Sequence, residues 1–116
     1  MKIVFLCSGG GGNLRFLDLV SSAMPMPIEV RGVLVDRPCP AEQYAVSRGL
    51  PCGRYRFDGT DDEEALAEID GWAPDFIVTN IHRILSPQWV VRHGSRLLNL
   101  HYSLLPAFAG RIGAAP

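Results

Sequence analysis

Short apolar runs alternate with amphipathic stretches along the whole chain. The apolar runs span residues 2–7, 28–35, 50–55, 76–79 and 97–100, and the first two are rich in Ile, Val, Leu and Phe, as in strands that are covered on both faces. Between them, residues 14–20, 41–48, 66–72 and 87–91 have apolar residues at helical spacing. This alternation predicts an α/β fold, in which an open, mostly parallel sheet carries helices on both faces.

The helical stretches carry signals of where they begin and what they bury. Thr60 and Glu63 have the spacing of a capping box, and the acidic residues 61–64 favour a solvated helix start over a metal site. Ser86 and Pro87 predict the N-cap and first turn of the last helix. The predicted buried face of the first helix consists of Leu14, Phe16, Leu17, Leu19 and Val20.

Four glycines follow the first apolar run. Residues 8–13 have the sequence Ser-Gly-Gly-Gly-Gly-Asn and lead into the first helix. Glycines let a backbone approach a ligand, and the N–H groups at a helix start favour a phosphate or carboxylate. A dinucleotide fingerprint would need glycine in place of Leu14, so Asp36 after the second run is expected to be a loop or cap residue. A tight turn without a ligand is the alternative.

A second polar signal lies in residues 97–106, with the sequence Leu-Leu-Asn-Leu-His-Tyr-Ser-Leu-Leu-Pro. This stretch predicts a short buried strand that ends in a polar loop. Asn99 and His101 share one face of an extended backbone, and Leu98 and Leu100 share the other. An amide beside an imidazole suits a carbonyl reaction, because the imidazole moves a proton while both groups stabilise an oxyanion. Side chains that only satisfy the loop backbone are the simpler alternative.

Three loops are expected to meet at one edge of the sheet. The glycine loop, residues 80–85 and residues 99–106 all follow predicted strands. In open parallel sheets, ligands bind beyond the carboxyl ends of the strands. The sequence therefore predicts that these loops converge on one cleft.

Composition narrows the classes of function. The chain has 116 residues and a formal net charge of −1, which fits one domain over residues 1–116 and disfavours a general nucleic-acid or membrane-surface binder. No apolar run approaches the ~20 residues that span a bilayer. The three cysteines, Cys7, Cys39 and Cys52, form no CxxC pair, and their odd number fits a reducing, cytoplasmic environment.

Three blocks together resemble the folate-dependent formyltransferases, in particular the glycinamide ribonucleotide formyltransferases of purine biosynthesis. The blocks are residues 8–13, residues 83–87 with the sequence Arg-Ile-Leu-Ser-Pro, and residues 97–106 with Gly110 beyond them. The resemblance implies the Rossmann-like fold of the family's N-terminal part. It also implies direct transfer of a formyl group from 10-formyltetrahydrofolate to a primary amine, first of all that of glycinamide ribonucleotide.

The resemblance implies residue roles as well. Asn99 and His101 match two of the family's three catalytic residues. The substrate phosphate would be held by the backbone of Gly11, Gly12 and Asn13. The pocket for the pterin-like ring would be lined by Arg83, Ile84 and Leu85, largely through backbone groups. A supporting loop would consist of Ser103, Leu104, Leu105 and Pro106, and no metal ion is implied.

The chain also departs from the family pattern. The third catalytic residue, an aspartate, lies downstream of residue 116 in the family, so we expect a portion of a longer enzyme or a short relative that needs a partner chain. Alone it would be weakly active or inactive and would tend to self-associate. Gly12 and Tyr102 stand where ribonucleotide enzymes commonly have Ser and Pro, which leaves the amine substrate open.

Several other functions remain as alternatives. Within the same resemblance, these are formylation of an amino sugar or amino acid and hydrolysis of formyltetrahydrofolate. A non-catalytic module that binds an anion or folate is an alternative from another class. A dinucleotide-dependent oxidoreductase is disfavoured by Leu14, which interrupts the glycine fingerprint.

Overall fold

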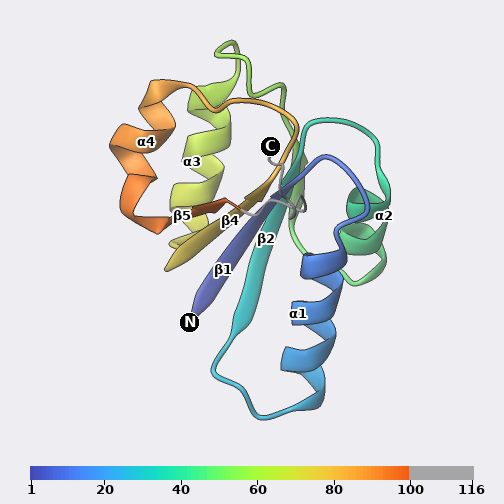
Figure 1. The fold of residues 1–116 in the computed structure, drawn as a ribbon. Coiled ribbons are helices and arrows are strands. Elements are labelled where there is room, and N and C mark those ends of the chain that lie inside the picture. The colour runs from blue at the N-terminus through green and yellow to red at the C-terminus, as the bar shows by residue number, and fades with distance from the viewer. Residues whose placement is uncertain (100–116) are drawn as a thin grey trace, which may run out of the picture.

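The computed structural model describes residues 1–99 of the chain. Within these residues one sheet is formed by β1 (Lys2–Cys7), β2 (Glu29–Val35), β3 (Cys52–Arg54), β4 (Phe76–Asn80) and β5 (Leu97–Asn99). The strand order is β3-β2-β1-β4-β5, and all neighbours are parallel (Figure 1). The prediction of an open parallel sheet is confirmed.

Helices cover both faces of this sheet. They are α1 (Gly12–Ala23), α2 (Pro40–Ser47), α3 (Asp62–Trp72) and α4 (Pro87–His93), followed by the short 3-10 helix η1 (Gly94–Arg96). Figure 1 shows α1 and α2 on one face and α3 and α4 on the other. Because β1 lies in the centre of the sheet, its side chains are buried on both faces from Ile3 to Cys7, which explains its continuous apolar run.

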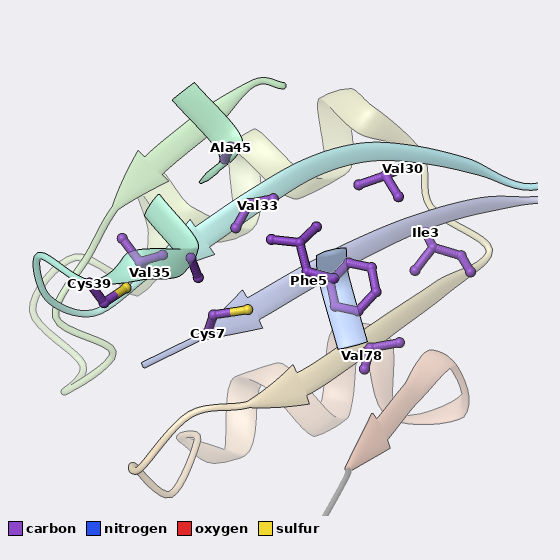
Figure 2. Close-up of a cluster of buried hydrophobic side chains, with 11 residues drawn as sticks. Ile3, Phe5, Cys7, Val30, Val33, Val35, Cys39, Ala45 and Val78 are labelled. Atoms are coloured by element: carbon purple, nitrogen blue, oxygen red, sulfur yellow. The ribbon is translucent and has the colours of Figure 1, made fainter. Parts of the chain in front are cut away.

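An apolar core lies on each side of the sheet. The core under α1 and α2 includes Phe5, Leu14 and Val33 (Figure 2), and the core under α3 and α4 includes Leu66 and Trp89. An irregularity in β2 affects which side chains enter them. Val30 pairs with Ile3 but Gly32 pairs with Val4, so Arg31 is an extra residue. Val30 and Val33 consequently both enter the first core although they are three residues apart.

The predicted buried face of α1 is only partly correct. Leu14 is fully buried, whereas Phe16 and Leu19 are 68% and 54% exposed. Asp18 is buried in their place, because Tyr44 Oη donates to its carboxylate at 2.5 Å and Arg48 Nε at 2.9 Å. On the face of α1 that the spacing of apolar residues predicts to be buried, Asp18 therefore makes a polar contact with Tyr44 of α2.

The predicted capping box is wrong. Thr60 lies before the helix, and its hydroxyl donates to Asp58 at 2.6 Å; the residue that precedes α3 is Asp61. The predicted solvated helix start is also wrong at Asp62, which is 1% exposed. Its carboxylate accepts hydrogen bonds from Ser86 Oγ at 2.5 Å and from Gln88 Nε2 at 3.2 Å, and it thereby joins α3 to the start of α4.

Replacing Asp62 by alanine is expected to lower the free energy of unfolding by about 1–3 kcal/mol, because half-buried donors on Ser86 and Gln88 lose their buried acceptor. Glu63→Ala is the matched control. Its side chain lies in the same helical turn but is 77% exposed, so a change within about 0.5 kcal/mol is expected. Urea unfolding of both variants measures the difference, and equal effects would contradict a structural role for the Asp62 network.

The three cysteines lie within the described residues and form no disulfide. Cys7 and Cys39 are buried and Cys52 is half-buried, and all three are free thiols. Burial raises the pKa of Cys7 to about 12, so the thiol stays protonated and unreactive at neutral pH. Within residues 1–99, no helix is long and apolar enough to cross a membrane.

Candidate active site

The last described strand, β5, brings Asn99 to the carboxyl edge of the sheet. β5 pairs with β4, and Asn99 lies opposite Thr79. The prediction that this strand is buried is wrong, because Leu98 is 46% exposed and Asn99 is exposed. β5 forms the edge of the sheet within residues 1–99, with a neighbouring strand on one side.

Thr79 fixes the orientation of the Asn99 amide. The Thr79 hydroxyl donates to Asn99 Oδ1 at 3.1 Å, and Thr79 is itself buried. Since the amide oxygen is the accepting end of this contact, the amide nitrogen is the donating end of the side chain. A donor at the end of a strand is the group that a developing oxyanion requires.

A cleft of about 590 Å³ opens between β5 and the loop that follows β4. Asn99 lines it together with Arg83, Ile84 and Leu85, so the predicted catalytic amide and the predicted pterin-binding residues share one cavity. Ile84 is 96% exposed, and Val90 of α4 adds a further apolar side chain to the lining. The cleft therefore combines an apolar surface with backbone groups and a polar end, as small-molecule sites do.

A second cavity, of about 250 Å³, lies beside the glycine loop. Its lining consists of Gly9, Gly10, Gly11, Gly12, Asn80 and His82. Asn80 and His82 also line the larger cleft, so the two cavities adjoin. The expected convergence of the glycine loop and residues 80–85 at one edge is thus observed, and β5 contributes Asn99 to the same edge.

The glycine loop has the backbone geometry of a helix start. Gly11 precedes α1 with φ of 67°, a left-handed conformation that favours glycine. Its ideal Cβ would lie 2.8 Å from Ala41 Cβ, whereas a Cβ on Gly12 would meet nothing within 4 Å. Gly12 and Asn13 form the first turn of α1, where backbone N–H groups attract anions.

Asp36 directly follows β2, and its side chain is fully buried. Arg37 Nε and Nη2 donate to its two oxygens at 3.0 Å each, and Arg83 Nε lies 3.3 Å from Oδ2. Burial by itself would raise the pKa of Asp36, but hydrogen bonds from Arg37 and Ser8 and the charge of Arg37 outweigh it and lower the pKa. Asp36 is a loop residue, as predicted. In a dinucleotide-binding site an acidic residue at this place binds the ribose hydroxyls, but here the Asp36 carboxylate is already bound by arginine.

The lowered pKa of Asp36 predicts a pH-dependent contribution to stability. A carboxyl whose pKa falls on folding stabilises the native state above its unfolded pKa of about 3.9, and that contribution is lost as the pH falls through the folded value. Asp36→Asn is therefore expected to lower the free energy of unfolding at pH 7 and to differ less from the parent chain below about pH 4. Urea unfolding at pH 7, 5 and 3 tests this, and a difference that grows at pH 3 would contradict it.

Part of the predicted site lies outside the described residues. This applies to His101, Tyr102, Ser103, Leu104, Leu105, Pro106 and Gly110. The structure also places Thr79 at the site, where the sequence predicts only the end of a strand. His82 belongs to residues 80–85, which the sequence does place at the cleft. A strand-end threonine in register with Asn99 gives no signal in sequence, because register is a tertiary property.

Comparison with protein families agrees with this geometry. The Formyl transferase family model matches residues 1–116. The chain belongs to the formyl transferase family. Within residues 1–99 no group of three or more His, Cys, Asp or Glu residues is arranged to hold a metal ion.

Relatives in this family include two kinds of enzyme. Phosphoribosylglycinamide formyltransferase of Escherichia coli is 35% identical over 120 residues, which covers 95% of this chain and 55% of that protein. Formyltetrahydrofolate deformylase of Haemophilus influenzae is 45% identical over 58 residues, which covers 48% of this chain and 20% of that protein. The crystal structure of phosphoribosylglycinamide formyltransferase from Brucella melitensis superposes with a TM-score of 0.78 at 31% identity, over 94% of this chain and 60% of that one. The chain thus spans about half the length of the E. coli enzyme.

Proposed function

We propose that this chain carries the donor site and part of the catalytic site of an enzyme that transfers the formyl group of 10-formyltetrahydrofolate to the amine of glycinamide ribonucleotide. The observation that supports it is the shared cleft, in which Asn99 faces the same cavity as Arg83, Ile84 and Leu85. The glycine-loop cavity adjoins that cleft through Asn80 and His82. The carboxyl edge of the sheet thus offers sites for the pterin-like ring of the donor, for its formyl carbonyl and for the substrate phosphate.

The described residues fit a folate donor. The volume of about 590 Å³ is in the range of sites for small organic ligands. Ile84, Leu85 and Val90 offer an apolar surface to a flat ring, and the backbone of residues 83–85 offers hydrogen bonds at its edge. When bound, 10-formyltetrahydrofolate supplies the activated formyl group.

The catalytic groups act on the charges that develop during transfer. The amine nitrogen of the substrate bonds to the formyl carbon, and the bond from that carbon to N10 of the folate breaks. The Asn99 amide donates a hydrogen bond to the formyl oxygen as it becomes negative, and His101 stabilises the same oxygen. The His101 imidazole takes the proton that the amine loses and returns it to N10, so no proton is gained or lost overall.

The substrate phosphate is assigned to the glycine loop. Backbone N–H groups of Gly11, Gly12 and Asn13 bind it at the start of α1, where the helix dipole favours negative charge. From the family resemblance alone, we assign the supporting-loop role to Ser103, Leu104, Leu105 and Pro106.

A coupled assay tests this function. The full chain is incubated with 10-formyltetrahydrofolate, with and without glycinamide ribonucleotide, and both formyl transfer and formate release are measured. Transfer that depends on the ribonucleotide supports the proposal. Formate release without the amine would instead support hydrolysis of the donor, the reaction that the likeness to a deformylase favours. Donor binding with neither product, at high protein concentration, would indicate a non-catalytic folate-binding module.

We also propose a cytoplasmic location and a tendency to self-associate. The free thiols of Cys7, Cys39 and Cys52 support a reducing compartment. Exposed apolar side chains such as Phe16, Leu19 and Leu98 support association through uncovered surface. Sedimentation at increasing protein concentration measures the association, and a monomer at all concentrations would overturn that part of the proposal.

A further inference from the structure

The buried carboxylate of Asp36 is the centre of a polar cluster with two exposed arginines, and the carboxylate itself takes no part in the proposed chemistry. It receives hydrogen bonds from Arg37 at two positions and pairs with Arg83 at 3.3 Å. Arg37 is its neighbour in sequence, whereas Arg83 belongs to the loop that lines the larger cleft. One carboxylate therefore connects the end of β2 to the loop that follows β4.

Ser8 provides a second connection between the same two segments. Its hydroxyl donates to Asp36 and accepts the backbone N–H of His82 at 2.9 Å. The backbone N–H of Ser8 donates in turn to Asn80 O at 3.2 Å. Because Ser8 is 4% exposed, solvent does not replace these contacts readily, so Asp36 orients the hydroxyl that holds His82.

The two ends of this loop are held by other contacts, because Ile81 and Leu85 pack against the core under α3 and α4 and Ser86 donates to Asp62, whereas its middle has few other constraints. Residues 81–86 belong to no helix or strand, and the side chains of His82, Arg83 and Ile84 are exposed. The path of this loop nevertheless determines the shape of both cavities, since His82 lines both and Arg83 lines the larger one. The Arg83 side chain and Ser8 both attach this loop to the buried Asp36 carboxylate, so Asp36 helps to determine the shape of the site.

We propose that Asp36 is a positioning residue for the donor cleft, which holds residues 82–85 in place through the Arg83 side chain and through Ser8. The name of the ligand in that cleft rests on the proposed function; the positioning itself does not. The catalytic amide of Asn99, in contrast, is oriented by Thr79 of β4. Loss of Asp36 should therefore affect donor binding much more than the chemical step.

Amide hydrogen exchange tests the positioning directly. In the full chain, Asp36→Asn and Ser8→Ala are each expected to accelerate exchange of the His82 amide about tenfold, because its acceptor is lost or disordered. Glu42→Gln is the matched control. Glu42 accepts two hydrogen bonds from Arg54, at 3.0 and 2.8 Å, so that variant also breaks a bidentate pair with arginine, but away from the loop. Unchanged exchange at His82 in both Asp36→Asn and Ser8→Ala would overturn the proposal.

Steady-state kinetics test the consequence for the site. Asp36→Asn is expected to raise the KM for 10-formyltetrahydrofolate about tenfold and to change kcat less than about threefold, whereas Glu42→Gln changes neither. A loss confined to kcat would overturn the assignment to the donor cleft. If the parent chain neither binds nor uses 10-formyltetrahydrofolate but His82 exchange still depends on Asp36, the proposed function fails and the positioning role stands.

Discussion

Asn99→Ala is expected to lower kcat for formyl transfer about 10²–10³-fold, and His101→Ala is expected to do the same, because each removes a group that stabilises the charge on the formyl oxygen. The amide of Asn99 is already oriented by Thr79 at 3.1 Å, so little reorganisation is needed when that charge develops. KM values for both substrates should change little, since these contacts strengthen only in the transition state. Steady-state kinetics on the full chain measure both parameters.

Leu98→Ala is the matched control for this prediction. Leu98 neighbours Asn99 in β5 but projects to the opposite face of the sheet, and it is 46% exposed. Its truncation should leave kcat within about threefold of the parent value, because no group that donates to the formyl oxygen is removed. Unchanged turnover in Asn99→Ala, or an equal loss in Leu98→Ala, would remove the catalytic assignment of β5.

Gly11→Val is expected to lower the free energy of unfolding by about 2–6 kcal/mol. The residue has φ of 67°, where a β-branched side chain costs about 1–3 kcal/mol. Its Cβ would also lie 2.8 Å from Ala41 Cβ and 3.3 Å from Ala41 Cα, and such overpacking costs about another 1–3 kcal/mol. Urea unfolding measures the loss, which is a large part of the stability of a domain of this size.

Gly12→Ala separates this effect from the mere loss of a glycine. A Cβ at Gly12 meets nothing within 4 Å, so its unfolding free energy should stay within about 0.5 kcal/mol of the parent value. In Gly11→Val, the affinity for glycinamide ribonucleotide should fall more than that for 10-formyltetrahydrofolate, because the loop that binds the phosphate is displaced. Equal losses for both ligands would point to general misfolding instead.

The sequence by itself determined the architecture of this protein. Continuous apolar runs in strands such as β1 and helical spacing between them specify a parallel sheet covered on both faces, since only that arrangement buries both sides of each central strand. The motifs at residues 8–13, 83–87 and 97–106 determined the family, because they combine rare residue types in a fixed order. The candidate residues for phosphate, donor and oxyanion followed from those motifs.

Tertiary structure decided which of those residues have partners and which surfaces are covered. Asp18 and Asp62 are buried acceptors, against the local patterns, because their donors lie outside their own helices, on Tyr44 and Arg48 for Asp18 and on Ser86 and Gln88 for Asp62. Thr79 orients Asn99 only through the register of β4 and β5. Asp36 meets Ser8 and Arg83 only because three parallel strands end at one edge. Contacts between residues distant in sequence depend on the packing of whole elements, so no local pattern of side chains encodes them.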